Sequence, residues 1–191
     1  ISIAFFGSLP FLLSDIDMNF IDSFFESTSG ITTTGATVIE SLESKSHGIL
    51  IWRALLQWLG GVGIIVMALA VLPMLSIGGM QLFKTESYET PDKVVPKAAS
   101  FAAGISIVYI TLTIVWAFML WGAGMSIFDS IAHAMTTLAT GGYSTKSESL
   151  AAFNSSTIEI IIIFGMLVGS LPFVHYLTIT KNGIKNLIKD D

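Results

Sequence analysis

The chain has 191 residues, of which 52% are hydrophobic and 12% are charged, and its formal net charge at pH 7 is −5. This composition is too apolar for an ordinary soluble domain of this length, and it predicts an integral membrane protein. The sequence contains no cysteine, which excludes disulfide and thiol chemistry.

The first apolar run, residues 1–13, is too short to cross a bilayer and contains Gly7 and Pro10. We interpret this run as the tail of a truncated leading helix. A cleaved secretory signal is disfavoured, because no basic segment precedes the run.

Three longer segments are expected to cross the membrane, at about residues 49–77, 98–121 and 157–178. No formally charged residue lies between Lys97 and Asp129, whereas a crossing needs only about 20 apolar residues. Two shorter helices are expected at about 20–31 and 127–138. A helix of about ten residues rises only roughly 15 Å, so each should enter the membrane and return to the same face.

The basic residues indicate which segments face the cytoplasm. Six of the nine Lys and Arg residues lie in two stretches: Lys84, Lys93, Lys97, Lys181, Lys185 and Lys189. The positive-inside rule makes residues 80–97 a cytoplasmic connector and 181–191 a cytoplasmic tail. Residues 14–50 and 122–157 then face outward, where their acidic side chains would concentrate cations. A plain polar outer surface is the alternative.

The chain also repeats itself at a fixed spacing. The distance along the sequence from Asp22 to Asp129 equals that from Gly35 to Gly142, and we call this spacing the repeat offset. Each of these segments precedes an apolar helix, so the offset predicts two tandem repeats, 1–79 and 98–180. Each repeat would consist of a helix, a re-entrant pore loop and a helix in an all-α membrane protein. Irregular backbone at membrane depth must be buried in protein or line a cavity, so a pore is implied.

The expected loops, 32–38 and 139–145, are rich in glycine and in small hydroxyl residues. Glycine allows main-chain carbonyls to turn toward one axis, and rings of carbonyls replace the hydration shell of potassium. The candidate filter residues are Thr32, Thr33, Thr34, Gly35, Ala139, Thr140, Gly141 and Gly142. The expected potassium ligands are the carbonyls of Thr33, Thr34, Gly35, Thr140, Gly141 and Gly142. A turn-rich surface loop is the alternative for either loop taken alone.

Several motifs are similar to those of one transporter family. They are FESTSGITTTGATV at 25–38, WR at 52–53, LQWLGGVG at 56–63, ATGGYST at 139–145 and FVHY at 173–176. Together they resemble the second and third repeats of the TrkH membrane subunits in the Trk/Ktr/HKT superfamily of potassium transporters. The resemblance covers nearly the whole chain.

The resemblance implies potassium uptake across the bacterial inner membrane through a pore of four repeats, of which this chain holds two. It further implies a homodimer in the lipid bilayer and a cytosolic nucleotide-binding regulatory ring. No enzymatic activity, no cofactor and no nucleic-acid partner are expected. A sodium-permeable or sodium-coupled relative is the alternative, since neither loop has the longer Thr-Val-Gly-Tyr-Gly sequence of potassium channels. A membrane scaffold is a further alternative, but it would leave the repeated loops unexplained.

The resemblance also implies an irregular, gate-forming loop near 165–170, with Gly165, Gly169 and Ser170 as its candidate residues. Glycine, serine and the nearby Pro172 weaken a helix, which favours this interpretation. Close packing of small residues against a neighbouring helix is the alternative.

Arg53 and two histidines lie in or next to the expected membrane helices. Arg53 could extend to the membrane interface as a structural residue, or it could pair with Glu26 or donate to pore-loop carbonyls. His133 and His175 lie on different expected helices, and their spacing is unlike that of metal ligands.

Overall fold

The computed structural model describes residues 1–75, 94–173 and 176, with side chains described for 1–63, 102–173 and 176. Every regular element in these ranges is a helix, and no strand occurs in them. The chain divides into two compact units. The first comprises Ile1–Gly61 and Thr111–Leu171, and the second Val62–Ile110 and Pro172–Asp191.

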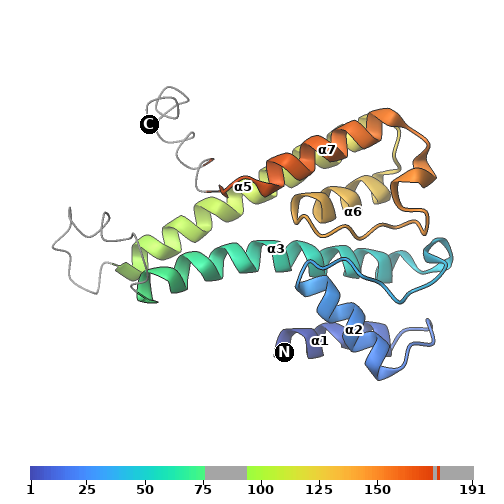
Figure 1. Ribbon diagram of the computed structural model, residues 1–191, viewed down its shortest axis with the longest axis horizontal. Coiled ribbons are helices and arrows are strands. Elements are labelled where there is room, and N and C mark those ends of the chain that lie inside the picture. Colours follow the sequence, from blue (N-terminus) through green and yellow to red (C-terminus); the bar gives the residue numbers. More distant parts are fainter. Residues whose placement is uncertain (76–93, 174–175, 177–191) are drawn as a thin grey trace. The chain divides into compact units, whose positions relative to one another are not determined.

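The first repeat contains α1 (Ser2–Leu12), α2 (Phe20–Ile31), a 3₁₀ turn η1 (Leu42–Ser44) and α3 (His47–Leu75). Helices α1 and α2 lie side by side (Figure 1). Helix α2 begins at a capping residue, because Asn19 Oδ1 accepts from the backbone N–H of Asp22 at 2.9 Å.

The second repeat contains α5 (Val94–Gly122), α6 (Ile127–Leu138), a 3₁₀ turn η3 (Ser149–Phe153) and α7 (Ser156–Ser170). Helices α6 and α7 lie side by side (Figure 1). Helix α6 begins as α2 does, since Ser126 Oγ accepts from the backbone N–H of Asp129 at 3.0 Å. Both caps place an acidic residue in the first turn, where it favourably meets the positive end of the helix dipole.

Two expected boundaries differ from the structure. The expected connector, 80–97, lies outside the described residues up to position 93, and its last four residues form the first turn of α5. The helix expected at 157–178 is interrupted, because α7 ends at Ser170 and Leu171 is extended, with ψ 144°. Residue 172 is proline, which disfavours helical backbone in the residue before it. The expected tail, 181–191, lies outside the described residues.

The interruption also corrects the expected gate loop. Residues 165–170 are helical, and the irregular backbone follows them at Leu171 and Pro172. The glycines therefore do not break the helix, whereas the proline does.

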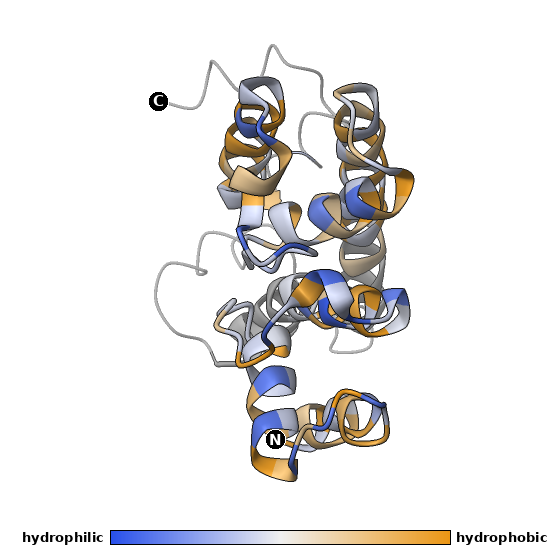
Figure 2. Cartoon of the chain, turned by 90° about the vertical axis from the view of Figure 1, so that its right-hand side faces the viewer, coloured by the Kyte–Doolittle hydropathy of each residue, from blue (hydrophilic) through white to orange (hydrophobic). Residues whose placement is uncertain are grey.

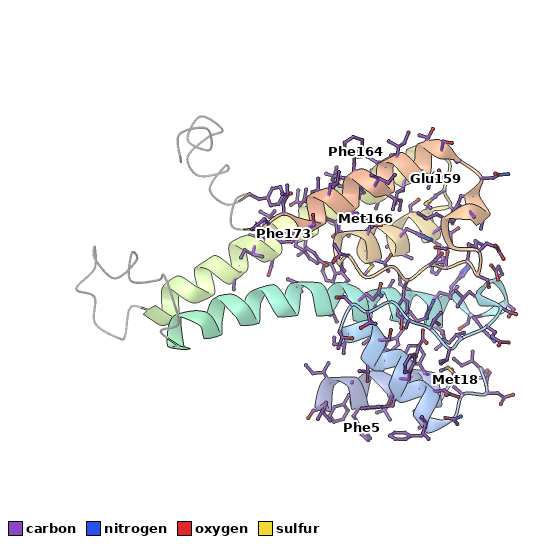
Figure 3. All side chains as sticks on the ribbon, in the orientation of Figure 1. Phe5, Met18, Glu159, Phe164, Met166 and Phe173 are labelled. Carbon is purple, nitrogen blue, oxygen red and sulfur yellow. The ribbon has the colours of Figure 1, made fainter. Side chains whose placement is uncertain are left out.

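Large apolar side chains cover much of the outside of the first unit. Phe6 on α1, Phe118 on α5 and Phe164 on α7 are 68%, 62% and 58% exposed. Figure 2 shows hydrophobic colouring on the outer helical surfaces, and Phe164 projects outward from α7 in Figure 3. Ala102–Gly122 is long and apolar enough to cross a membrane, the one such segment found in the described part of the chain. These exposed apolar surfaces suit a lipid environment.

Candidate functional site

The two pore loops, 32–38 and 139–145, have matching backbone conformations. Thr33 and Thr140 have φ values of 54° and 51°, and Gly35 and Gly142 have φ values of 80° and 85°. Left-handed backbone is uncommon for threonine, and its recurrence at the same two places makes the loops structural copies of each other. Each loop follows the C-terminal end of a short helix, α2 or α6.

The two loops touch at their glycines. A Cβ atom added to Gly35 would collide with the carbonyl oxygen of Gly141, and one added to Gly141 would collide with the side chain of Gln57. Both positions therefore need a residue without a side chain. Gly35 needs it for a second reason, because its φ is positive.

Most of the expected ligand carbonyls accept no hydrogen bond from the described part of the chain. Within the described residues, no hydrogen bond ends on the carbonyls of Thr33, Thr34, Gly35, Thr140 or Gly142. The carbonyl of Gly141 differs, because it accepts from Gln57 Nε2 at 2.8 Å.

The two other candidate filter residues lie at helix ends. Thr32 is the C-terminal capping residue of α2, and Ala139 is that of α6. The partly negative end of each short helix therefore lies next to its pore loop, an arrangement that favours a cation there.

Glu26 and Arg53 form a buried ion pair behind the first pore loop. Their side chains are 0% and 1% exposed, and Arg53 Nε donates to Glu26 Oε1 at 2.8 Å. Glu26 also accepts from Thr37 Oγ1 at 2.9 Å and from the backbone N–H of Val38 at 3.0 Å. The carboxylate thus holds the C-terminal end of the first pore loop.

Arg53 also reaches the second pore loop. Its Nη1 donates to the carbonyl of Ser144 at 2.9 Å, and its guanidinium carbon lies 4.1 Å from the centre of the Tyr143 ring. Both predicted contacts, with Glu26 and with a pore-loop carbonyl, are confirmed. The alternative, extension to the membrane interface, is wrong, because the arginine is held by buried partners.

Tyr143 completes the connection between the loops. Its hydroxyl group lies 2.9 Å from the carbonyl of Glu26 and 3.2 Å from that of Ala36. Sequence reasoning missed both this tyrosine and Gln57. The only available signal for Gln57 was a polar residue among apolar ones, four residues after Arg53 and therefore on the same face of a helix.

A further contact joins the segments that follow the two pore loops. Glu43 accepts from the backbone N–H of Ser147 at 2.7 Å and from its hydroxyl group at 2.8 Å. These hydrogen bonds, that of the backbone foremost, hold the pKa of Glu43 below its ordinary value of 4.5.

His133 occupies the place in α6 that Glu26 occupies in α2, because the repeat offset separates the two positions. Its Nε2 lies 3.0 Å from Ser144 Oγ, and the same offset leads from Thr37 to Ser144. The hydrogen bond between Glu26 and Thr37 therefore recurs as one between His133 and Ser144. The other ring nitrogen of His133, Nδ1, lies 2.8 Å from the carbonyl of Asp129. His175 lies outside the described residues.

The candidate gate glycines lie in close packing contacts. A Cβ atom on Gly165 would meet Thr137 Cγ2 at 2.7 Å and Trp116 Cδ1 at 2.8 Å, and one on Gly169 would meet the carbonyl oxygen of Leu138 at 2.8 Å. The glycines let α7 approach α6 closely. This is the packing alternative that the sequence left open.

Comparison with known proteins agrees with this architecture. The model of the TrkH family of cation transport proteins matches residues 1–190. The Trk system potassium uptake protein TrkH of Escherichia coli (strain K12) is 42% identical over 188 residues, which are 96% of this chain and 39% of that protein. The corresponding protein TrkI of Halomonas elongata is 40% identical over 192 residues, 100% of this chain and 39% of that protein.

A solved structure is similar as well. The crystal structure of the potassium transporter TrkH from Vibrio parahaemolyticus superposes with a TM-score of 0.84 at 40% sequence identity, covering 98% of this chain and 38% of that chain. This chain thus spans about two fifths of the length of its relatives. Its fold is that of an all-α membrane protein built from helix, pore-loop, helix repeats. The extent of the family match and the likeness of the fold together establish that the chain belongs to the TrkH family of cation transport proteins.

Proposed function

We propose that this chain forms part of the pore of a Trk-type potassium transporter in the bacterial inner membrane. The observation that carries the proposal is the pair of matched pore loops, whose glycines lie in contact. Relatives named as potassium uptake proteins support the choice of ion.

The ion would be bound by main-chain oxygens and not by side chains. The carbonyls of Thr33, Thr34, Gly35, Thr140 and Gly142 accept no hydrogen bond within the described residues, and Gly141 retains a second lone pair beside its bond to Gln57. Carbonyls that replace the hydration shell allow a potassium ion to enter a narrow pore. The ion moves down its electrochemical gradient, and no covalent bond is made or broken.

The whole transporter would need more than this chain supplies. Two pore loops provide half of a fourfold ring of carbonyls, so the other two repeats complete the filter. A homodimer and a cytosolic nucleotide-binding ring would be its further partners.

Potassium uptake by a transport-deficient host tests the proposal. The full-length protein should restore growth at low potassium, and Gly35→Ser and Gly142→Ser should each reduce uptake and weaken the preference for potassium over sodium. Serine disfavours the positive φ of both glycines, and at Gly35 it also collides with Gly141. If both variants kept wild-type uptake and selectivity, the filter assignment would be wrong. Equal uptake of the two ions by the wild-type protein would favour the sodium-permeable alternative.

A further inference from the structure

Gln57 on α3 makes a two-point contact with the second pore loop. Its Nε2 donates to the carbonyl of Gly141 at 2.8 Å, and its Oε1 accepts from the backbone N–H of Tyr143 at 3.0 Å. These partners fix the amide orientation, because an exchange of oxygen and nitrogen would oppose donor to donor and acceptor to acceptor. Gln57 therefore forms hydrogen bonds with the residues on both sides of Gly142.

Burial keeps both hydrogen bonds of Gln57 formed. Gln57 is 0% exposed, so its amide group has no access to water in place of the loop backbone. A buried amide that loses its partners is destabilising, and the two hydrogen bonds therefore stay formed. As a result the Gly141 carbonyl is held in a fixed orientation, with Gln57 and Gly35 directly against it.

The other repeat has a different residue at the equivalent position. Gly60 packs against the carbonyl of Ile31 in the same way that Gly169 packs against that of Leu138. The sequence distance from Gly60 to Gly169 equals that from Gln57 to Met166. Met166 is therefore the residue of α7 that corresponds to Gln57 of α3. The side chain of methionine has no N–H donor, so Met166 cannot form the corresponding pair of hydrogen bonds.

We propose that Gln57 is a positioning residue that fixes the peptide planes around Gly142 and thereby contributes to the ion selectivity of the pore. This inference rests on the proposed function. A filter discriminates between potassium and sodium by the number and placement of its carbonyls. By holding the Gly141 carbonyl, Gln57 determines which oxygens of the second loop face the ion.

Two variants of the full-length protein separate the contributions of the two Gln57 hydrogen bonds. Gln57→Glu keeps the shape and an acceptor for Tyr143 but opposes a carboxylate oxygen to the Gly141 carbonyl. Gln57→Leu removes both hydrogen bonds. Leu59→Met, two residues along the same helix and 46% exposed, serves as the matched control.

Potassium and sodium uptake into proteoliposomes is measured at equal protein content. Gln57→Glu should lower the potassium-to-sodium uptake ratio by roughly two- to tenfold, the range expected for the loss of one buried hydrogen bond, and Gln57→Leu, which loses both bonds, should lower it at least as much. Leu59→Met should keep the wild-type ratio. A purely structural role would reduce the amount of folded protein without altering this ratio.

Each other outcome has a distinct meaning. If the wild-type protein prefers potassium and both Gln57 variants keep that preference, the inference is overturned and the proposed function stands. If the wild-type protein transports neither ion, the proposed function itself fails. If neither Gln57 variant accumulates as folded protein while Leu59→Met does, Gln57 serves folding alone, which also overturns the inference.

Discussion

The two loop glycines, Gly35 and Gly142, differ in their surroundings although their backbones match. The Gly141 carbonyl lies where a Cβ atom on Gly35 would be, whereas nothing lies within 4 Å of a Cβ atom placed on Gly142. At Gly142 an added methyl group meets only the cost of left-handed backbone, about 1–2 kcal/mol. At Gly35 the same group also pushes the two loops apart.

We therefore expect Gly35→Ala to impair potassium uptake more than Gly142→Ala does. The first variant should lose most transport, because its Cβ displaces the neighbouring loop. The second should retain a measurable fraction of it. Uptake rates at equal membrane abundance test this ranking, and equal losses in both variants would contradict it.

Residue-level detail was the least accessible to sequence reasoning. The loop glycines could be identified from composition and the repeat offset, since glycine is needed where φ is positive. Gln57 and Tyr143 could not, because their partners lie 84 to 117 residues away in sequence. Only the packing of one repeat against the other brings them together.

At the scale of elements, α2 and α3 are joined by a charge pair that lies out of reach of water. Glu26 and Arg53 are almost fully buried, and each has partners in addition to the other. Removing one charge leaves the other buried and unpaired, which typically costs about 3–5 kcal/mol.

A double-mutant cycle should reveal this coupling. We expect Glu26→Gln and Arg53→Met each to destabilise the protein strongly, and the double variant to be less destabilised than the sum, because no unpaired charge remains. Thermal unfolding of the purified full-length protein in detergent provides the measurement. Strictly additive losses would indicate that the pair contributes little.

Exchanging the two charges should not restore stability. The carboxylate of Glu26 also accepts from the backbone N–H of Val38. An arginine at position 26 would oppose this donor with another donor.

Element boundaries followed from local sequence signals wherever such a signal is strong. The expected short helices at 20–31 and 127–138 coincide with α2 and α6, since each has a polar capping residue and a clear apolar pattern. The helix expected at 157–178 ends earlier, at Ser170, because Pro172 disfavours helical backbone in the residue before it. In the structure the proline ends the helix, and the glycines serve its packing.

At the scale of the molecule, the segments that follow the two pore loops are linked through Glu43. Its carboxylate binds Ser147 by two hydrogen bonds, and its pKa is lowered as a consequence. A lowered pKa in the folded state means that ionised Glu43 stabilises this link above pH 4.5. The contribution is lost as the pH falls below 4.5 and through the folded-state value.

Glu43→Gln should remove this dependence on pH. At pH 6 the wild-type protein should melt at a higher temperature than the variant, and the difference should shrink as the pH falls below 4.5. The effect should be small, because Glu43 is exposed to solvent. Melting curves of both proteins across this range test the expectation, and a constant difference would contradict it.

Glu26 and His133 occupy equivalent positions of the two repeats, and this difference affects the electrostatic potential between the loops. A carboxylate with its guanidinium partner stands behind one loop, whereas an imidazole ring stands behind the other. An ion bound between the loops, as we propose, would therefore experience an uneven electrostatic potential, even though the backbone around it would be repeated. Because both copies belong to one polypeptide, a single mutation alters the potential from one side alone. Identical subunits around an axis could not be adjusted in this way, since every mutation would appear in all of them at once.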